Sequence, residues 1–300
     1  MTLMTLKTLK TLMTLMTLMT LMTLMTLNTL NPINTPKKKT NNVNILKIIY
    51  TFAPNNTKMI AAILAAGMAK RLRPLTDTQP KCMLKVGTRS LIGRTAEALL
   101  QAGISEAVVV TGYRGEMIHS FLDNNYPELN AHYVVNEDYE TTNSIYSLWL
   151  TKTYTAGRDF MLLDSDILFH PDIITRLLEE EGTVLAMNRH TCGEEEMKVV
   201  VDSQGMVCQI SKGCDPQAAA GELVGIEKID AAYSKALFEE LAVMQTKEHL
   251  TGIFYEKAFE RLIAKGFLFR AIDTTKMFSM ELDTIDDFAR AKEIIPKELF

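Results

Sequence analysis

The sequence predicts an α/β fold, with a doubly wound, mostly parallel sheet and a small antiparallel lobe on the same sheet. Three observations predict it. Short apolar runs alternate with amphipathic helical ones after Met59, polar residues follow the ends of those runs, and the pattern changes from Lys198 onward. Such alternation is typical of βαβ units with right-handed crossovers. Because ligands bind these sheets beyond the carboxyl ends of the strands, the strand ends are the places to search for chemistry.

The predicted parallel strands of the first half are short, apolar and rich in β-branched residues, as strands buried on both faces are. Apolar residues recur three and four positions apart in two helical segments between them, at 90–102 and 115–122. The predicted strands span residues 60–65, 107–111, 132–136 and 160–163.

The second half changes rhythm at Lys198 and predicts an antiparallel meander around a turn at 203–205. We expect it to form a lobe on the same sheet and no separate domain. Its predicted strands span 199–202, 206–211, 223–228 and 267–273, and its predicted helices span 231–244, 255–264 and 285–294.

Residues 1–58 differ in composition from the rest of the chain. Residues 1–30 repeat a triplet ending in Thr-Leu, and a period of three suits neither a helix face nor a strand face. Regular threonines and two lysines interrupt it, which disfavours a membrane helix or a signal peptide. Residues 31–58 have linker composition. We expect 1–58 to be a disordered repeat and linker, Met59 to be the natural start, and 59–300 to be the catalytic domain.

Charge and cysteine content exclude several classes of protein. The net charge of −4 gives no field that would attract nucleic acid or a membrane surface. The four cysteines form no CxxC pair and no Cys/His cluster with metal-ligand spacing, which indicates reduced thiols in a cytoplasmic protein and argues against zinc.

The loop after the first predicted strand is the most informative segment. Its small residues would let a nucleotide lie against the backbone, and Lys70, Arg71, Arg73 and Lys81 are placed to meet phosphates. It is neither a Rossmann GxGxxG nor a Walker A sequence, and a basic surface loop is the alternative. The segment reads Leu64-Ala65-Ala66-Gly67-Met68-Ala69-Lys70-Arg71-Leu72-Arg73-Pro74, followed by Pro80-Lys81.

This segment resembles the signature loop of the sugar-phosphate and choline-phosphate nucleotidyltransferases, roughly L-A-A-G-x-G-x-R-L-x-P followed by P-K. The resemblance spans about residues 59–295 and implies a Rossmann-like nucleotidyltransferase fold with catalytic, triphosphate-binding Arg71 and Lys81. Ala69 departs from the pattern, which has a glycine there. The expected nucleotide-binding residues, including two at later strand or helix ends, are Leu64, Ala65, Ala66, Gly67, Arg71, Lys81, Gly112 and Asn143.

Two acidic clusters suggest a metal. Asp164 and Asp166 follow an apolar strand, and burying carboxylates there is costly without a cation such as Mg²⁺. The resemblance implies that Asp166 is a catalytic metal ligand supported by Asp164, and that Glu281 and Asp283 add metal ligands before the last helix. A helix cap made by Asp283 with Asp286 is the alternative for the second cluster.

The acceptor-binding residues follow from the same resemblance, which makes the antiparallel lobe the acceptor side. Residues 143–148 and 221–226 resemble the phosphocholine cytidylyltransferase branch, as does the aromatic, aromatic, acid group of Phe254, Tyr255 and Glu256. A quaternary ammonium would suit a cage of aromatic rings, to which Tyr146 and Trp149 could contribute, although such aromatics also fill cores. The expected acceptor-binding residues are Lys212, Glu222, Tyr255 and Glu256, with a solvated lysine as the alternative for Lys212.

The resemblance implies transfer of a nucleoside monophosphate, with CTP favoured as donor, to a small phosphorylated acceptor such as phosphocholine. The acceptor phosphate is already anionic, so the reaction needs no general base, and none of the histidines lies in a catalytic motif. Two alternatives remain at this point. One is a sugar 1-phosphate acceptor, and the other is an inactive regulatory subunit that binds nucleotide.

Overall fold

Residues 59–299, the part of the chain that this computed structural model describes, alternate strands and helices; the expectations for 1–58 lie outside the described residues. The main sheet contains β1 (Ile60–Ala65), β4 (Glu106–Thr111), β5 (Asn130–Val135), β6 (Phe160–Asp164), β8 (Val184–Asn188), β9 (Lys198–Val201), β10 (Val207–Ser211), β11 (Gly221–Ile229) and β12 (Arg270–Asp273). Short strands are β2 (Lys85–Val86), β3 (Arg89–Ser90), β7 (Ile167–Phe169) and β13 (Ser279–Glu281). The helices are α3 (Leu91–Gln101), α4 (Gly115–Asn125), α5 (Ser144–Leu150), α6 (Lys152–Thr155), α7 (Asp172–Leu178), α8 (Ala231–Thr246), α9 (Glu256–Ala264) and α10 (Ile285–Ile294).

Four neighbouring strands of the main sheet, β6, β1, β4 and β5, are parallel. β1, β4 and β6 are buried along almost their whole length, as strands covered on both faces must be. Parallel strands bring their carboxyl ends to one edge, so the segments after Ala65, Thr111 and Asp164 meet there.

The second half of the chain extends the same sheet, as the sequence predicts. β11 runs antiparallel to β6, β8 and β9, and β9 pairs with β10. The register between β11 and β8 shifts between Leu223 and Glu227, and within this shift Gly225 takes a φ of +81°, which favours glycine. The nine-stranded sheet has the order β10-β9-β11-β6-β1-β4-β5, with β8 on β11 and β12 on β8.

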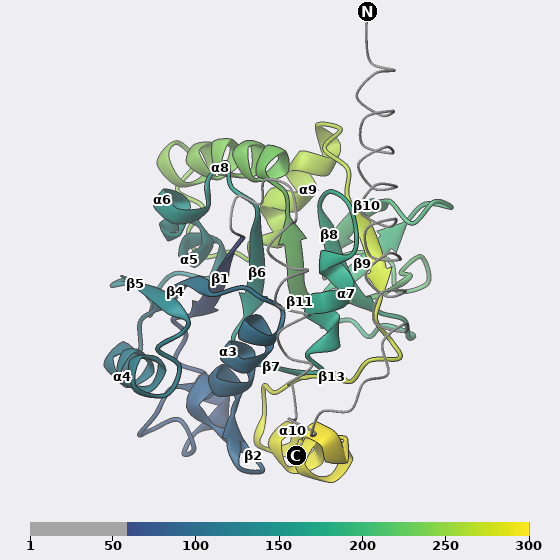
Figure 1. The fold of residues 1–300 in the computed structure, drawn as a ribbon. Coiled ribbons are helices and arrows are strands. Elements are labelled where there is room, and N and C mark those ends of the chain that lie inside the picture. The colour runs from purple at the N-terminus through teal and green to yellow at the C-terminus, as the bar shows by residue number, and fades with distance from the viewer. Residues whose placement is uncertain (1–58, 300) are drawn as a thin grey trace, which may run out of the picture. The chain divides into compact units, whose positions relative to one another are not determined.

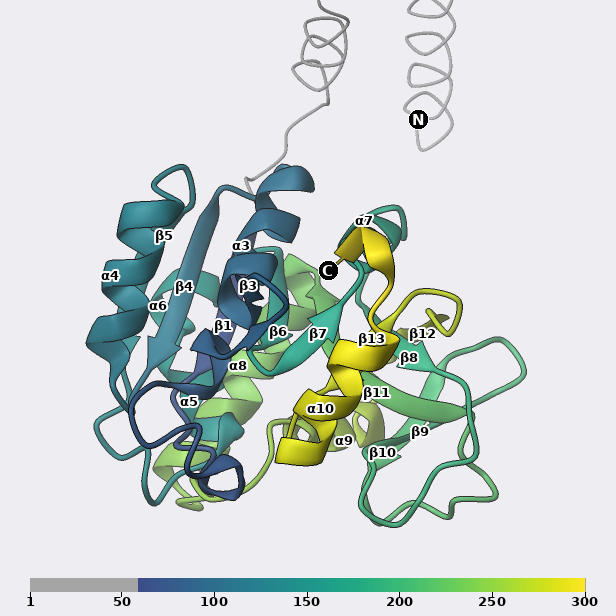
Figure 2. The same ribbon diagram turned by 90° about the horizontal axis from the view of Figure 1, so that it is seen from below.

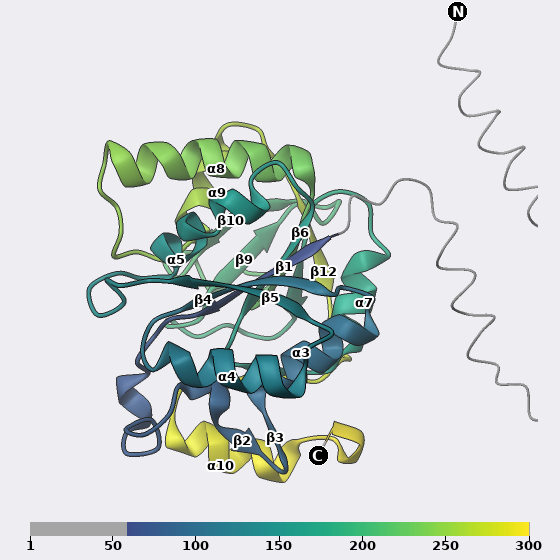
Figure 3. The same cartoon turned by 60° about the vertical axis from the view of Figure 1, so that its left-hand side comes forward.

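Helices cover both faces of this sheet, as Figures 1 and 3 show. α5, α8 and α9 pack on one face, in a core that includes Leu237, while α3, α4 and α7 pack on the other, in a core that includes Leu99. Ala62 belongs to the first core and Ile63 to the second, because successive strand residues point to opposite faces. The doubly wound α/β fold is thus confirmed.

A third, smaller core ties the end of the chain to the loop after β1. Phe288 and Ala291 of α10 pack with Leu72 of that loop, Val86 of β2 and Leu282. α10 lies beside β2 and β3 in Figure 3, and Figure 2 shows β13 against β7. This core holds two segments far apart in sequence next to each other, and both contribute to the site described below.

The structure also differs from the prediction in places. β8 was missed, although Val184–Asn188 is a buried apolar run like the predicted strand at 160–163. The last predicted strand, 267–273, begins only at Arg270, since Phe267 and Leu268 are 43% and 52% exposed. Among residues 59–299, no helix has the length and hydropathy needed to cross a membrane.

Candidate active site

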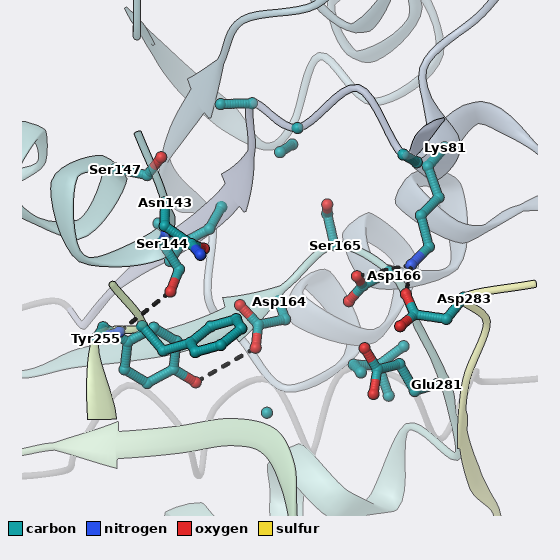
Figure 4. A pocket seen from close by; sticks show the side chains of 18 of the residues that line it. Lys81, Asn143, Ser144, Ser147, Asp164, Ser165, Asp166, Tyr255, Glu281 and Asp283 are labelled. Atoms are coloured by element: carbon teal, nitrogen blue, oxygen red, sulfur yellow. Dashed lines mark hydrogen bonds and ion pairs between the residues drawn. The ribbon is translucent and has the colours of Figure 1, made fainter. Parts of the chain in front are cut away.

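A cleft of about 330 Å³ lies beyond the carboxyl ends of the parallel strands, within the size range of small-molecule sites. Figure 4 shows its two ends, one around Lys81 and Asp283 and the other around Asn143 and Tyr255. We call them the Lys81 end and the Tyr255 end. The structure brings together all but one of the residues that the sequence selects, namely Leu64, Ala65, Ala66, Gly67, Arg71, Lys81, Asn143, Asp166, Lys212, Glu222, Tyr255, Glu256, Glu281 and Asp283.

Gly112 is the exception, because it lies behind the lining of the cleft. A Cβ atom at this position would come within 2.7 Å of the Ala66 carbonyl oxygen and of the Tyr139 side chain, both of which belong to residues that line the cleft. The backbone N–H of Tyr113 donates to the same carbonyl at 3.0 Å. Gly112 therefore allows the next strand end to support the loop after β1, a positioning role that differs from the predicted ligand contact.

The loop after β1 closes around Ala69. Ala69 has left-handed backbone angles, φ 46° and ψ 55°, and its carbonyl accepts hydrogen bonds from the Leu72 N–H at 3.0 Å and the Thr76 hydroxyl at 3.1 Å. This is the position at which the resembling loops carry glycine. The departure therefore places a Cβ atom in a conformation that costs L-residues about 1–2 kcal/mol.

The Lys81 end joins two cations and two carboxylates. The Lys81 amine donates to Oδ2 of Asp166 at 2.9 Å and to Oδ1 of Asp283 at 2.5 Å. Arg71 donates to the other oxygen of Asp283. The Lys81 side chain is 11% exposed and that of Arg71 is 72% exposed, so Lys81 is the cation held in place by its surroundings.

The charges at this end stabilise one another. Burial acts to lower the pKa of Lys81, but Asp166 and Asp283 outweigh it, and the pKa is raised. Desolvation acts to raise the pKa of Asp283, but Lys81 and Arg71 lower it below its ordinary value. Glu281 forms no ion pair among residues 59–299, and desolvation together with Asp166 and Asp283 outweighs the charge of Lys81 and raises its pKa to about 7.

Strand pairing brings these carboxylates together from distant parts of the chain. Asp166 lies in the turn between β6 and β7, and β7 pairs with β13 so that Glu281 stands opposite Ile167. The helix-cap alternative for Asp283 is wrong. Thr284 caps α10 in a reciprocal capping box with Asp287, which leaves the Asp283 side chain to Lys81 and Arg71.

The chemistry of this end fits a divalent cation. Carboxylate oxygens of Asp166, Glu281 and Asp283 lie within 4.8 Å of one another, and Mg²⁺ prefers such oxygens. Oδ1 of Asp166 is buried and has no hydrogen-bond partner among the described residues. A buried oxygen of this kind needs a positive partner, which an ion between the three carboxylates would supply.

The Tyr255 end is built where α5 begins. Asn143 caps α5, and its side-chain oxygen accepts from the Ser144 N–H at 2.7 Å. Oγ of Ser144 accepts from the backbone N–H of Tyr255 at 3.1 Å. This second hydrogen bond fixes the start of α9 against the start of α5.

Tyr255 lines the cleft but is only 1% exposed. Its hydroxyl donates to Oε1 of Glu227 at 3.1 Å and lies 3.3 Å from Oδ2 of Asp164. Tyr146 and Trp149 are not among the described residues that line the cleft, and Trp149 instead packs against the core. The structure thus assembles no ring of aromatic side chains around Tyr255.

Asp164, Glu227 and Glu256 at the Tyr255 end form no ion pair with a lysine or arginine of the described part of the chain, and the charge of Lys212 does not offset the burial of Glu256. Burial, with repulsion from other acids, raises the pKa of Asp164 and of Glu227 well above the ordinary values. Burial also raises the pKa of Glu256 to about 7, and Oε2 of Glu256 is buried with no hydrogen-bond partner among the described residues. This end is therefore short of positive charge.

Lys212 and Phe254 mark the open side of the Tyr255 end. The Lys212 amine stands 5.1 Å from the centre of the Phe254 ring, and both residues line the cleft. Glu222 lines it as well, and burial raises the pKa of its carboxyl group. Lys212 is thus directed toward the cleft, as the sequence analysis expected.

Some residues of the cleft were not selected from the sequence. Ser165 and Tyr139 line it but carry no distinctive motif. Glu227 supports Tyr255 from within β11. It follows the apolar run 223–226, which was a usable signal, because a buried charge in a strand needs a reason.

The comparisons with known proteins agree with this architecture. Residues 60–194 match the family model described as nucleotidyl transferase. The chain is 32% identical over 149 residues to the CTP:phosphoglutamine cytidylyltransferase of Campylobacter jejuni, covering 48% of this chain and 53% of that protein. It is 33% identical over 250 residues to the CMP-5'-(3-aminopropyl)phosphonate synthase of Streptomyces rubellomurinus, covering 80% of this chain and 40% of that protein. This chain thus spans about half the length of these curated relatives.

One other relative is matched over its full length. The choline-phosphate cytidylyltransferase of Streptococcus pneumoniae is 25% identical over 243 residues, covering 80% of this chain and 100% of that protein. A solved structure of CTP:phosphocholine cytidylyltransferase from Streptococcus pneumoniae superposes with a TM-score of 0.67 at 22% identity, covering 80% of this chain and all of that one. Glucose-1-phosphate uridylyltransferase of Haloferax volcanii is also similar, 31% identical over 127 residues, 41% of this chain and 51% of that protein. The predicted family resemblance is therefore confirmed, with residues 60–194 matching the nucleotidyl transferase model.

Proposed function

We propose that this chain transfers CMP from CTP to a small phosphorylated acceptor that carries a positive charge, releasing pyrophosphate. The observation that carries the proposal is the contrast within one cleft. Lys81 and Arg71 can bind a triphosphate at the Lys81 end. At the Tyr255 end, Glu256 has a buried oxygen with no hydrogen-bond partner among the described residues. CTP is favoured because several relatives are cytidylyltransferases.

The reaction is an in-line displacement at the α-phosphorus of the nucleotide. An oxygen of the acceptor phosphate forms the new bond to this phosphorus, and the bond to the bridging oxygen of the β-phosphate breaks, so pyrophosphate leaves with the electron pair. Lys81 and Arg71 bind and orient the leaving phosphates. Asp166, Glu281 and Asp283 would hold a Mg²⁺ ion, which would supply further positive charge for the phosphates. An anionic acceptor needs no base, so no proton is moved.

The nucleoside lies in this proposal against the small residues from Leu64 to Gly67, where backbone can approach the base and ribose. The N-terminal turn of α5, with Asn143 and Ser144, faces it from the opposite side.

The acceptor lies at the Tyr255 end. Lys212 binds its phosphate, and the cationic group meets Glu256 and Glu222, with Phe254 as the accessible aromatic face. The buried Oε2 of Glu256 gains a partner when an ammonium group binds. This assignment favours phosphocholine or a close aminoalkyl phosphate over a neutral sugar phosphate.

The experiment that tests the proposal is a matrix of donors and acceptors. Four nucleoside triphosphates are combined with phosphocholine, 2-aminoethylphosphonate, inositol phosphate and glucose 1-phosphate, and pyrophosphate release is measured. We expect CTP with a cationic acceptor to give the highest kcat/KM. If UTP or dTTP with glucose 1-phosphate is best, the acceptor assignment is wrong, and if no pair releases pyrophosphate, so is the enzymatic one.

We place the activity in the cytoplasm. All four cysteines lie within the described residues and are free thiols, of which Cys208 is exposed. Free thiols are expected in a reducing compartment. Fractionation of cells that express the native protein checks this.

A further inference from the structure

The loop between β8 and β9 brings together three side chains of types that bind transition metals. The ligand atoms of His190, Cys192 and Glu196 all lie within 4.8 Å of one another. The spacing of the cysteines in the sequence predicts no zinc site. That prediction considers CxxC pairs and Cys/His clusters, whereas this cluster combines one cysteine and one histidine with a carboxylate.

A further carboxylate, that of Glu222 on β11, lies beside this cluster. Nε2 of His190 lies 3.1 Å from Oε2 of Glu196 and 3.6 Å from Oε2 of Glu222. Ligand atoms about 2.0–2.3 Å from a tetrahedral Zn²⁺ are about 3.3–3.8 Å from one another. The two observed separations are close to this value. His190, Cys192 and Glu196 are thus already grouped, and Glu222 is within reach of His190 as a fourth side chain.

The surrounding structure orients this cluster. Oε2 of Glu196 accepts from the backbone N–H of Gly193 at 2.8 Å, and ligating carboxylates usually have such a second hydrogen bond. Lys198 is 1% exposed, and its amine donates to the carbonyl oxygens of Glu194 at 2.8 Å and Glu196 at 3.2 Å. A buried lysine thus holds the backbone that presents Cys192 and Glu196.

We propose that His190, Cys192, Glu196 and Glu222 bind one Zn²⁺ ion. A thiolate and an imidazole select zinc over Mg²⁺, which prefers oxygen ligands alone. The thiol of Cys192 loses its proton to solvent when the metal binds. This site is separate from the three carboxylates at the Lys81 end.

Zinc at this site would act on the acceptor side of the cleft. Glu222 lines the cleft, so its carboxylate cannot serve the metal and an acceptor ammonium equally. Glu195 and Met197, beside the ligand Glu196, also line the cleft. Zinc therefore raises the KM for a cationic acceptor and leaves that for the nucleotide unchanged. This second statement rests on the proposed function, whereas the metal site itself does not.

Titration with Co²⁺, a spectroscopic substitute for Zn²⁺, tests the site in the full chain with excess Mg²⁺ present. We expect one equivalent to bind, with a thiolate-to-cobalt charge-transfer band and the visible bands of a tetrahedral ion, and Zn²⁺ to displace it. Cys192→Ser should abolish the charge-transfer band, and His190→Ala should weaken binding at least about tenfold. Cys208→Ser is the matched control, because Cys208 is an exposed thiol outside the cluster, and it should bind as the unmodified chain does.

The proposal is wrong if no equivalent binds, or if the charge-transfer band survives Cys192→Ser. Circular dichroism of each variant without metal shows whether it is folded. If Cys192→Ser does not fold, His190→Ala decides alone, and unchanged affinity in that variant overturns the site. Asp166→Asn should retain the bands, since its side chain belongs to the other cluster. No substrate is needed, so an error in the proposed function leaves this result readable.

Discussion

Asp283 at the Lys81 end of the cleft and Glu256 at the Tyr255 end are carboxylates in opposite electrostatic states. At the Lys81 end, Lys81 and Arg71 lower the pKa of Asp283 and keep it ionised. At the Tyr255 end, burial raises the pKa of Glu227 well above its ordinary value and that of Glu256 to about 7. Asp283 is therefore kept as an anion by its cationic neighbours, whereas Glu227 and Glu256 lie in surroundings with little positive charge.

In the proposed reaction, this difference would let one cleft bind both a nucleoside triphosphate and a phosphorylated acceptor. At the Lys81 end, Lys81 and Arg71 pair with Asp166 and Asp283. In the proposed reaction these carboxylates would hold a divalent cation and Lys81 would pair with the phosphates, so neither group would be left without a partner. At the Tyr255 end the missing charge must come from the ligand itself. Substitutions at the Lys81 end and at the Tyr255 end should therefore have different effects.

Asp166→Asn should have the largest effect. It removes a negative charge from the carboxylate group while preserving shape, so we expect kcat to fall by ~10²–10³-fold or more, because several kcal/mol of transition-state stabilisation depend on the metal. Pyrophosphate release at saturating Mg²⁺ measures this, and thermal unfolding checks that the variant is folded. Turnover close to that of the unmodified chain would show that Asp166 holds no metal.

Lys81→Ala should come next, with a loss of ~10²-fold in kcat/KM, because it removes a confined charge from the leaving phosphates. Arg71→Ala should lose less, about tenfold, since its side chain is 72% exposed and screened by water. Lys70→Ala is the matched control in the same loop, where Lys70 is exposed, and it should change kcat/KM by less than about twofold. Equal small losses of kcat/KM in all three variants would show that this loop is a basic surface loop that does not bind the triphosphate.

Asp283→Asn and Asp287→Asn separate catalysis from helix capping. Asp283 pairs with Lys81, so its variant should lose activity with little change in unfolding temperature. Asp287 accepts the N–H of Thr284 at 2.7 Å in the capping box, so its variant should lose about 1 kcal/mol of stability and keep most activity. Kinetics and chemical denaturation of both variants provide the check. The reverse pattern would restore the capping interpretation of Asp283.

The sequence predicted the loop after β1 and the acids at the ends of their elements because those features are local. The run from Leu64 to Lys81 is contiguous, and α10 has a readable start. The pairing of β7 with β13, which brings Asp166 beside Glu281, joins segments more than a hundred residues apart and leaves no local signal. Likewise, the buried hydroxyl of Tyr255, just before α9, donates to Glu227 of β11, a contact with no local signal in the sequence. Local chemistry was thus predictable, whereas the environment of each group was not.

Glu256→Gln should change the pH dependence of stability. The pKa of Glu256 is about 7 in the fold and ordinarily 4.5, so between these pH values the folded chain keeps a proton that the unfolded chain has lost. Stability therefore falls as pH rises through this window. Gln avoids this cost, so the variant should gain about 1–3 kcal/mol relative to the unmodified chain at pH 8, by the value of a pKa unit, and little at pH 5.

Urea unfolding at the two pH values measures this gain, with Glu239→Gln as the control because Glu239 is exposed. An equal effect of Glu256→Gln at both pH values would mean that this carboxylate is not short of positive charge. The contrast between the two ends would then be lost.

Ala69→Gly should give the smallest effect, and it concerns the geometry under the Lys81 end. Ala69 has a φ of 46°, and a Cβ atom in this region costs about 1–2 kcal/mol, part of which is returned because glycine gains more freedom in the unfolded chain. The net gain should therefore be up to about 1 kcal/mol in urea unfolding. Ala102→Gly is a useful contrast, since Ala102 caps α3 with a φ of −78° and has no left-handed strain to relieve, so it should not be stabilised. If Ala69→Gly also fails to stabilise, the loop geometry depends on the Cβ atom, and CTP affinity measured in the same variant would show whether that atom shapes the nucleotide site.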